Sequence, residues 1–123
     1  MLLPREGVVD CYVLKDSSGK VTDMLSCYHL PSSVLNNDKH NHLEVAYSYY
    51  NVATTVPLVS LMKDLLIIAR NVNVDVVNAL ELMENETVFE ALEFKPGDGF
   101  LQYYVYNWKC PPVGTTDVGL VLL

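Results

Sequence analysis

The chain has 123 residues and a formal net charge of −7, because fifteen acidic side chains outnumber eight basic ones. This length suits one domain with one hydrophobic core. Half of the residues are hydrophobic and only 19% are charged, which argues against a disordered chain. The basic residues are scattered along the sequence. Because a phosphate backbone requires clustered positive charge, this argues against nucleic acid as a partner.

The first part of the chain has the pattern of a β-hairpin followed by a third strand. Residues 8–14 and 21–30 are rich in strand-forming side chains, and the polar run 15–20 separates them as a turn. Residues 36–42 (N-N-D-K-H-N-H) indicate a surface loop. A third strand is predicted over residues 44–52.

The middle of the chain changes to helical periodicity. Apolar side chains recur at helical spacing over residues 58–71, and Pro57 stands at the first turn, which predicts a helix. A further strand is predicted over residues 74–80. The run 87–90 has the form of a capping box, which predicts a short helix that ends before Pro96.

The last part of the chain is aromatic and then aliphatic. A turn over residues 95–99 precedes a predicted aromatic strand over 100–108, and a final strand is predicted over 118–122. No linker or internal repeat divides the sequence. It therefore predicts a single domain, residues 1–123, of the α+β class, with a mixed, mostly antiparallel sheet flanked by helices.

Tyrosine is the most unusual residue type in this composition. There are eight tyrosines, and all of them lie on predicted strands: Tyr12, Tyr28, Tyr47, Tyr49, Tyr50, Tyr103, Tyr104 and Tyr106. Two interpretations are open. The rings pack against each other across neighbouring strands, or they line a peptide groove with their phenol hydroxyls.

The sequence lacks the familiar motifs of metal, hydrolase and phosphate sites. Cys11, Cys27 and Cys110 are widely spaced and no histidine accompanies them in a metal-binding motif, so no metal site is expected. Ser32 and Ser33 lack a nucleophile elbow, and the glycines form no phosphate-binding loop. Three widely spaced cysteines favour reduced thiols and a cytoplasmic protein, and the apolar runs are shorter than a membrane span.

Five stretches, in one order along the chain, closely resemble the C-terminal half of eukaryotic glycylpeptide N-myristoyltransferase. They are residues 23–33 (D-M-L-S-C-Y-H-L-P-S-S), 46–52 (A-Y-S-Y-Y-N-V), 75–85 (D-V-V-N-A-L-E-L-M-E-N), 97–109 (G-D-G-F-L-Q-Y-Y-V-Y-N-W-K) and 118–123 (V-G-L-V-L-L). The resemblance implies the peptide-binding half of a two-half enzyme, each half with an acyl-CoA N-acyltransferase (GNAT-like) fold. That enzyme family transfers myristate from myristoyl-CoA to the N-terminal glycine amine of proteins.

The resemblance also implies roles for individual residues. The first half of the enzyme, which this sequence lacks, would bind the acyl-CoA donor. No cofactor is therefore expected on this chain, and the chain alone would be inactive. The terminal carboxylate of Leu123 would accept the proton of the substrate's glycine ammonium, with the apolar run before it as an anchor. The peptide groove would be lined by Tyr28, Ser32, Tyr47, Asn78, Asp98, Gly99 and Leu101.

A terminal carboxylate is a weak base in water. An α-carboxyl group titrates near ~3.5 and an α-amino group near ~8, so direct proton transfer is unfavourable by roughly 6 kcal/mol. Burial raises the pKa of the carboxyl group and lowers that of the ammonium group. A buried terminus therefore makes the transfer feasible, and only the neutral amine can attack the thioester.

Two other functions compete with the transferase half. The chain could be a module that binds N-terminal glycine peptides without chemistry, which affinity without turnover would reveal. A small acetyltransferase that uses acetyl-CoA is disfavoured, because the sequence has no loop for the phosphates of coenzyme A. The expected partners are glycine-initiated peptides and the missing N-terminal half, and neither nucleic acid nor metal.

Overall fold

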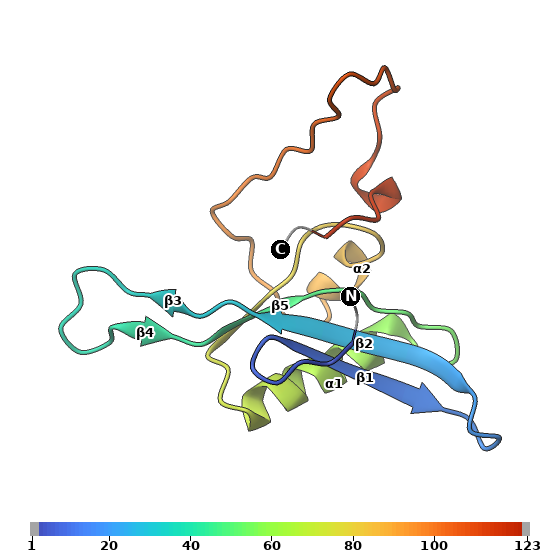
Figure 1. The fold of residues 1–123 in the computed structure, drawn as a ribbon, viewed down its shortest axis with the longest axis horizontal. Coiled ribbons are helices and arrows are strands. Elements are labelled where there is room, and N and C mark those ends of the chain that lie inside the picture. The colour runs from blue at the N-terminus through green and yellow to red at the C-terminus, as the bar shows by residue number, and fades with distance from the viewer. Residues whose placement is uncertain (1–2, 122–123) are drawn as a thin grey trace.

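The computed structural model describes residues 3–121 and forms an α+β fold (Figure 1). In this range the main sheet has four strands in the order β1-β2-β5-β6, and helix α1 lies along one face of it. The predicted class, a mixed and mostly antiparallel sheet flanked by helices, is confirmed. The bounds of these elements are β1 (Val9–Lys15), β2 (Val21–His29), β5 (Val45–Ser48), β6 (Val76–Asn78) and α1 (Leu58–Asn71).

Strands β1 and β2 form the predicted hairpin. They pair antiparallel from Val9 opposite Tyr28 to Lys15 opposite Val21. In the turn, Asp16 Oδ1 accepts hydrogen bonds from the Ser18 and Lys20 backbone N–H groups at 2.8 and 3.1 Å. A side chain that satisfies the turn's own backbone explains why this polar run forms a tight connection.

Helix α1 has the bounds that the apolar periodicity predicts, and it connects two parallel strands. It begins directly after Pro57, whose φ of −61° suits a helix entry. β5 precedes the helix and β6 follows it, paired parallel to β5. A crossover helix is the usual way to join neighbouring parallel strands. The helix buries four side chains against the sheet: Leu61, Met62, Leu65 and Ala69.

A second, two-stranded ribbon extends from the main sheet as an arm (Figure 1). It consists of β3 (Ser32–Ser33) and β4 (His42–Leu43), which pair antiparallel. The predicted loop 36–42 is an exposed loop at the tip of this arm, except that its last residue belongs to β4.

Helix α2 (Glu86–Phe89) begins two residues before the position that a capping box with Thr87 as N-cap predicts. Its N-terminus has no side-chain cap, so the capping-box prediction is wrong. The Thr87 hydroxyl instead donates to the Glu84 carbonyl at 2.6 Å. A threonine in the first turn of a helix can donate its hydroxyl to the carbonyl three residues earlier. That threonine then does not cap the N-terminus of the helix.

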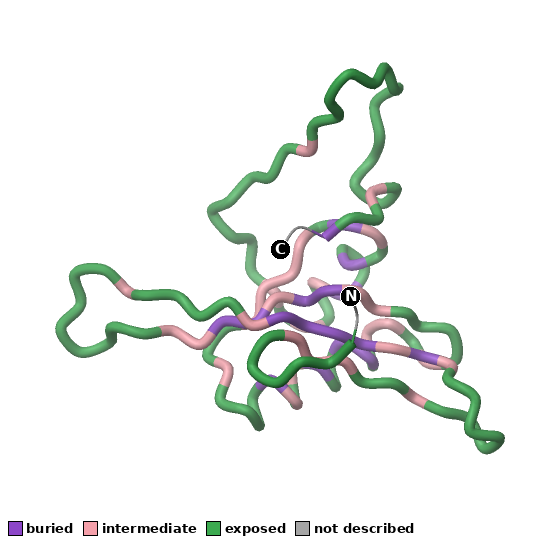
Figure 2. The backbone as a smooth tube through the Cα atoms, viewed as in Figure 1, coloured by how far each residue is buried: buried purple, intermediate pink, exposed green. Residues whose placement is uncertain are grey.

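The predicted strands of the last part of the chain are wrong. Residues 100–108 belong to no strand, and most of the segment is exposed (Figure 2). A strand requires a partner for its backbone groups, and none of the described strands pairs with this segment. Residues 118–121 are likewise not a strand and follow a short 3₁₀ turn, η1 (Thr115–Asp117); residue 122 lies outside the described range.

The main sheet separates two hydrophobic clusters. The helix-side cluster contains Leu25, Cys27, Ala46, Leu61, Met62, Leu65 and Val88. The tyrosine-side cluster contains Tyr28, Tyr49, Leu82 and Val121, with Tyr47, Tyr50 and Tyr103 packed against it. Neighbouring residues on a strand point to opposite faces, so the sheet sends Cys27 and Tyr28 into different clusters. No helix within residues 3–121 is long and apolar enough to cross a membrane.

Candidate functional site

One row of residues crosses the whole main sheet and forms the floor of the candidate site. Strand pairing places Val9 opposite Tyr28, Tyr28 opposite Tyr47, and Tyr47 opposite Asn78. Directly paired residues share a face of the sheet, which is here the face away from α1. Three residues that were expected to line a peptide groove, Tyr28, Tyr47 and Asn78, are therefore brought together by the backbone itself.

The tyrosines on this face pack closely. The Tyr28 ring stacks on Tyr47 with 5.1 Å between centroids and 9° between planes, and it meets Tyr49 edge-on at 5.6 Å and 82°. Tyr49 contacts Tyr50 at 4.5 Å. The stacked and the edge-on arrangements of Tyr28 are both favourable geometries for aromatic pairs. The predicted cross-strand packing of tyrosines is confirmed for this group.

Burial also affects the chemistry of the central phenol. It raises the pKa of Tyr28 above the ordinary value for tyrosine, and the neighbouring Tyr47, Tyr49 and Tyr103 add to the increase. Removal of the proton would leave a phenolate among other phenols in a poorly hydrated place. Tyr28 therefore keeps its proton at neutral pH and remains a hydrogen-bond donor, not a base.

The last described residues of the chain lie on the tyrosine face. Val121 is 5% exposed, and its backbone N–H donates to the Tyr50 hydroxyl at 3.1 Å. The Tyr103 hydroxyl donates to the Leu120 carbonyl at 2.8 Å. Two tyrosine side chains thus hold consecutive backbone groups next to the row described above. Leu123, the predicted base, lies outside the described residues.

The remaining predicted site residues are not gathered at this face. Ser32 is exposed at the start of the β3–β4 arm. Asp98, Gly99 and Leu101 lie in the exposed C-terminal segment, where Leu101 is 53% exposed. Their proposed contacts with a peptide stay predictions.

Sequence reasoning missed three members of the site. Tyr49, Tyr50 and Tyr103 were seen only as strand tyrosines, yet they pack against the row or hold residues 120–121. For Tyr49 a signal was present, because it lies two residues after Tyr47 and alternate residues of an extended segment share a face. For Tyr103 there was none, because its partner Leu120 is distant in sequence.

A buried carboxylate outside the site has a structural role. Asp23 is 1% exposed, and one of its oxygens accepts hydrogen bonds from the Thr54 and Thr55 backbone N–H groups at 2.7 and 2.8 Å. Burial alone would raise the pKa of Asp23, but hydrogen bonds from Thr22, Thr55 and Thr54 outweigh it and hold the pKa well below its usual range. Asp23 therefore stays ionised and fastens the segment before α1 to β2.

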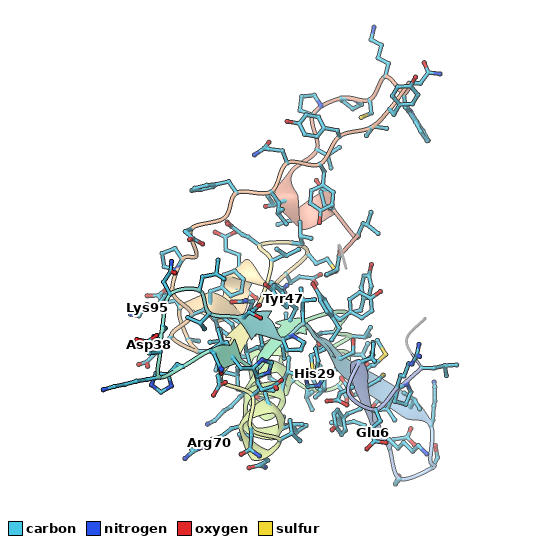
Figure 3. The ribbon with its side chains drawn as sticks, turned by 60° about the vertical axis from the view of Figure 1, so that its left-hand side comes forward. Glu6, His29, Asp38, Tyr47, Arg70 and Lys95 are labelled. Carbon is cyan, nitrogen blue, oxygen red and sulfur yellow. The ribbon has the colours of Figure 1, made fainter. Side chains whose placement is uncertain are left out.

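One group of described side chains has the donor atoms of a metal site. The ligand atoms of Asp10, Cys27 and His29 all lie within 4.8 Å of one another. They come from β1 and β2 and lie at the helix-side face, opposite the tyrosines; Figure 3 labels His29 and Tyr47. No sequence motif unites them, since the three positions meet only through the pairing of two strands.

Comparison with known proteins identifies close relatives. The model of the family described as "Myristoyl-CoA:protein N-myristoyltransferase, C-terminal domain" matches residues 1–120. The chain is 54% identical over 120 residues to glycylpeptide N-tetradecanoyltransferase 2 of Bos taurus, with 98% of this chain and 24% of the relative covered. It is 51% identical to glycylpeptide N-tetradecanoyltransferase of Drosophila melanogaster, with 98% and 25% covered. The chain thus spans about a quarter of the length of these relatives.

Solved structures give the same picture. The structure is similar to that of Saccharomyces cerevisiae N-myristoyltransferase with bound myristoyl-CoA, with a TM-score of 0.68 and 35% identity over 75% of this chain and 24% of the other. A mutant of the BH1408 protein of Bacillus halodurans, with a TM-score of 0.61 over 82% of this chain and 68% of the other, is only 8% identical. That second likeness shows the fold alone.

Proposed function

Because the chain belongs to the myristoyl-CoA:protein N-myristoyltransferase family, whose C-terminal domain it matches, we propose that the whole protein transfers myristate from myristoyl-CoA to the N-terminal glycine amine of substrate proteins. In this proposal the present chain supplies part of the peptide groove. The observation that carries it is the tyrosine face, where a row of paired residues meets the backbone of residues 120 and 121.

The groove would use the tyrosine face for shape and hydrogen bonding. Tyr28 and Tyr47 would offer a stacked apolar surface to the peptide. Asn78 can both donate and accept at the end of the row. Such a surface suits an extended peptide backbone, which alternates donors and acceptors.

The exposed part of the proposed groove lies at the positions matched by the family resemblance. Ser32 would contact the peptide from the arm, and Gly99 and Leu101 from the C-terminal segment. Asp98 is exposed and carries a negative charge that suits a lysine several residues into the substrate. These contacts would form only when this segment is ordered against a peptide and the rest of the enzyme.

The C-terminal carboxylate would act as the base of the reaction. In a protein whose last residue is Leu123, the terminal carboxylate would take one proton from the glycine ammonium, and the neutral amine would then attack the thioester carbonyl and release coenzyme A as thiol. The hydrogen bonds to residues 120 and 121 support this, because they hold the backbone two residues before that carboxylate. Poor hydration beside Val121 would make the carboxylate a stronger base.

The rest of the enzyme is the partner that this proposal requires. Relatives are about four times as long as this chain, and the acyl-CoA site would lie in the part beyond it. The exposed aromatic side chains of residues 100–108 support this division, since apolar groups of this size commonly mark an interaction surface. The isolated chain would therefore bind peptide weakly and transfer nothing.

The test combines the chain with the remaining part of the enzyme, expressed separately or in one polypeptide. Myristoyl-CoA and a glycine-initiated basic peptide are added, and acylated peptide is measured by mass spectrometry. We expect product only when both parts are present. Peptide affinity without turnover in the complete protein would support the non-catalytic binding module instead, and turnover by the chain alone would refute the division of labour.

The role of the terminus needs a separate comparison. In the complete enzyme, conversion of the Leu123 carboxylate to an amide should reduce kcat strongly and leave peptide affinity nearly unchanged. Val121→Ala, which keeps the carboxylate but loosens its anchor, is the matched variant and should lower kcat less. An amidated enzyme with full kcat would eliminate the terminal carboxylate as the base.

A further inference from the structure

The β1–β2 hairpin places three potential metal ligands together on its helix-side face. Asp10 lies directly opposite Cys27, and His29 follows Cys27 by two residues, so all three share a face. The His29 Nε2 atom is 2.8 Å from Asp10 Oδ2. The Cys27 sulfur completes a group whose ligand atoms are all within 4.8 Å of one another.

We propose that Asp10, Cys27 and His29 bind one Zn²⁺ ion, with the fourth coordination position open to water or a small ligand. The donor set of one oxygen, one nitrogen and one sulfur suits zinc, which accepts all three. Mg²⁺ and Ca²⁺ prefer oxygen ligands alone and would not use the thiolate.

The surroundings of the cluster favour a cation. Asp10 and His29 line an open depression of about 420 Å³, together with Glu6 and Glu44. Three carboxylates, those of Glu6, Asp10 and Glu44, line this space, and among the described residues no lysine or arginine does. Clefts lined by one sign of charge concentrate ions of the opposite sign. The depression gives an ion a route from solvent to Asp10 and His29. Cys27, which is 3% exposed, is buried next to these two ligands.

The geometry needs only small side-chain movements. A tetrahedral zinc ion with bonds of about 2.0–2.3 Å keeps its ligand atoms roughly 3.3–3.7 Å apart. The 2.8 Å contact between Asp10 and His29 would open slightly as the ion replaces their hydrogen bond, and Cys27 would approach. The backbone positions are already fixed, because all three residues belong to paired strands.

Ionisation of the thiol is the main obstacle. Burial, with a smaller effect from Asp10, raises the pKa of Cys27 to about 11. Without a metal the residue is therefore an inert core thiol. A coordinated thiol loses its proton to solvent as the sulfur–metal bond forms, and the zinc ion then balances the thiolate and the Asp10 carboxylate.

The consequence would be structural. Tyr28 lies between Cys27 and His29 and projects to the opposite face, where it stacks on Tyr47. An ion held by both of its neighbours and by Asp10 would tie edge strand β1 to β2 directly behind that ring. Because zinc binds only the folded arrangement, it would raise the melting temperature of the protein.

Titration of the reduced, metal-free protein with Zn²⁺ and Co²⁺ tests the site. Calorimetry should give one Zn²⁺ per chain, and Co²⁺ should produce a thiolate-to-metal charge-transfer absorption band. His29→Gln should weaken Zn²⁺ binding by at least ~10-fold, and Cys27→Ala should abolish the absorption band. Circular dichroism of each variant confirms that the fold persists.

Two matched controls separate this site from incidental binding. His42 Nε2 lies 2.7 Å from Glu44 Oε1 in a similar histidine–carboxylate pair without a thiol, so His42→Gln should leave zinc affinity unchanged. Cys110 is an exposed thiol, and Cys110→Ala should leave the Co²⁺ band unchanged. The proposal is overturned by the absence of stoichiometric binding, by binding that survives His29→Gln and Asp10→Asn, or by a band that depends on Cys110.

Discussion

Large apolar side chains occur both in the sheet with its helix and in the segment of residues 95–117, but the two regions differ strongly in burial. In the body, β2 alternates between two clusters and four side chains of α1 are buried. In the C-terminal segment, Phe100, Tyr104 and Tyr106 are 90, 89 and 98% exposed. Figure 2 shows that most of this segment is exposed. Large apolar side chains are therefore not sufficient to bury a part of this chain.

The two regions differ in whether they make their own packing contacts. The body, meaning the main sheet with helix α1, contains both partners of each contact. Helix α1 packs on the sheet, the strands pair with one another, and the tyrosine rings contact one another. The segment has few such contacts: Tyr103 packs against the tyrosine-side cluster, but none of the described strands pairs with the segment. Large exposed aromatics that the fold does not use are a sign of a surface made for another part of the protein. Substitutions in each region test this difference.

The largest effect is expected inside the helix-side cluster. Leu65 is fully buried, so Leu65→Ala removes buried methyl groups, leaves a cavity and should lower the free energy of unfolding by about 2–5 kcal/mol. Ile67 lies on the same helix but is 49% exposed, and Ile67→Ala should change it by less than ~1 kcal/mol. Urea unfolding followed by circular dichroism measures both. Equal losses would show that the body lacks a packed core.

A smaller loss is expected from the buried carboxylate that joins β2 to the entry of α1. Asp23→Asn removes the charge that the Thr54 and Thr55 backbone N–H groups stabilise. Because the folded pKa of Asp23 is lowered, its stabilisation is complete above the unfolded pKa of about 3.9 and is lost as pH falls below that value toward the folded pKa.

Unfolding of the wild type and of Asp23→Asn, measured from pH 6 downward, shows this difference. The wild type should be the more stable protein at pH 6, and the gap should narrow as the solution becomes acidic. Asp16→Asn is the exposed comparison: hydrogen bonds from Ser18 and Lys20 also lower the pKa of Asp16, so its gap should narrow in the same direction but be smaller, because this turn is exposed. A gap that is constant with pH would contradict the assigned role of the Asp23 charge.

A more local effect is expected where the tail meets the tyrosine face. Tyr50→Phe removes the acceptor of the Val121 N–H and should weaken the attachment of the tail by about 1 kcal/mol. Hydrogen exchange of the Val121 amide should then be roughly fivefold faster. Tyr106→Phe, at a 98% exposed ring, should have no effect. An unchanged exchange rate in Tyr50→Phe would mean that packing alone holds the tail.

The smallest effect on stability is expected in the exposed segment. Trp108 is 75% exposed, so Trp108→Ser should alter the unfolding free energy of the chain by less than ~0.5 kcal/mol. The same variant should weaken association with the remaining part of the enzyme, which a pull-down or calorimetric titration can measure. Destabilisation of the isolated chain by more than ~2 kcal/mol would show that the segment belongs to the body after all.

Local signals were sufficient for much of the fold. The helix 58–71 was predicted at both ends because apolar spacing and Pro57 act over a few residues, and the first hairpin was predicted because its turn is a short polar run between two strand-forming runs. The capping-box prediction was wrong because the Thr87 hydroxyl donates to the Glu84 carbonyl and does not accept from a backbone N–H of the helix. The aromatic strand failed because strand propensity says nothing about whether a partner edge exists.

The site shows the same division. Tyr28, Tyr47 and Asn78 could be named from the family resemblance, but their alignment in one row depends on the parallel pairing of β5 with β6 across a helix, which no local pattern encodes. The grouping of Asp10 with Cys27 and His29 was missed for a similar reason, since it arises only in the register of the hairpin. Leu123 was named by resemblance and lies outside the described residues.

The alternation along β2 also limits how the length of this chain can vary. Cys27 belongs to the helix side and Tyr28 to the tyrosine side, so a one-residue shift of β2 would exchange the two sets of side chains. An insertion near Asp16 that altered the pairing would therefore move rings into the helix-side core and a thiol onto the face that carries the tyrosines. The tip of the β3–β4 arm, which is exposed and supports neither cluster, is where added or deleted residues can be absorbed.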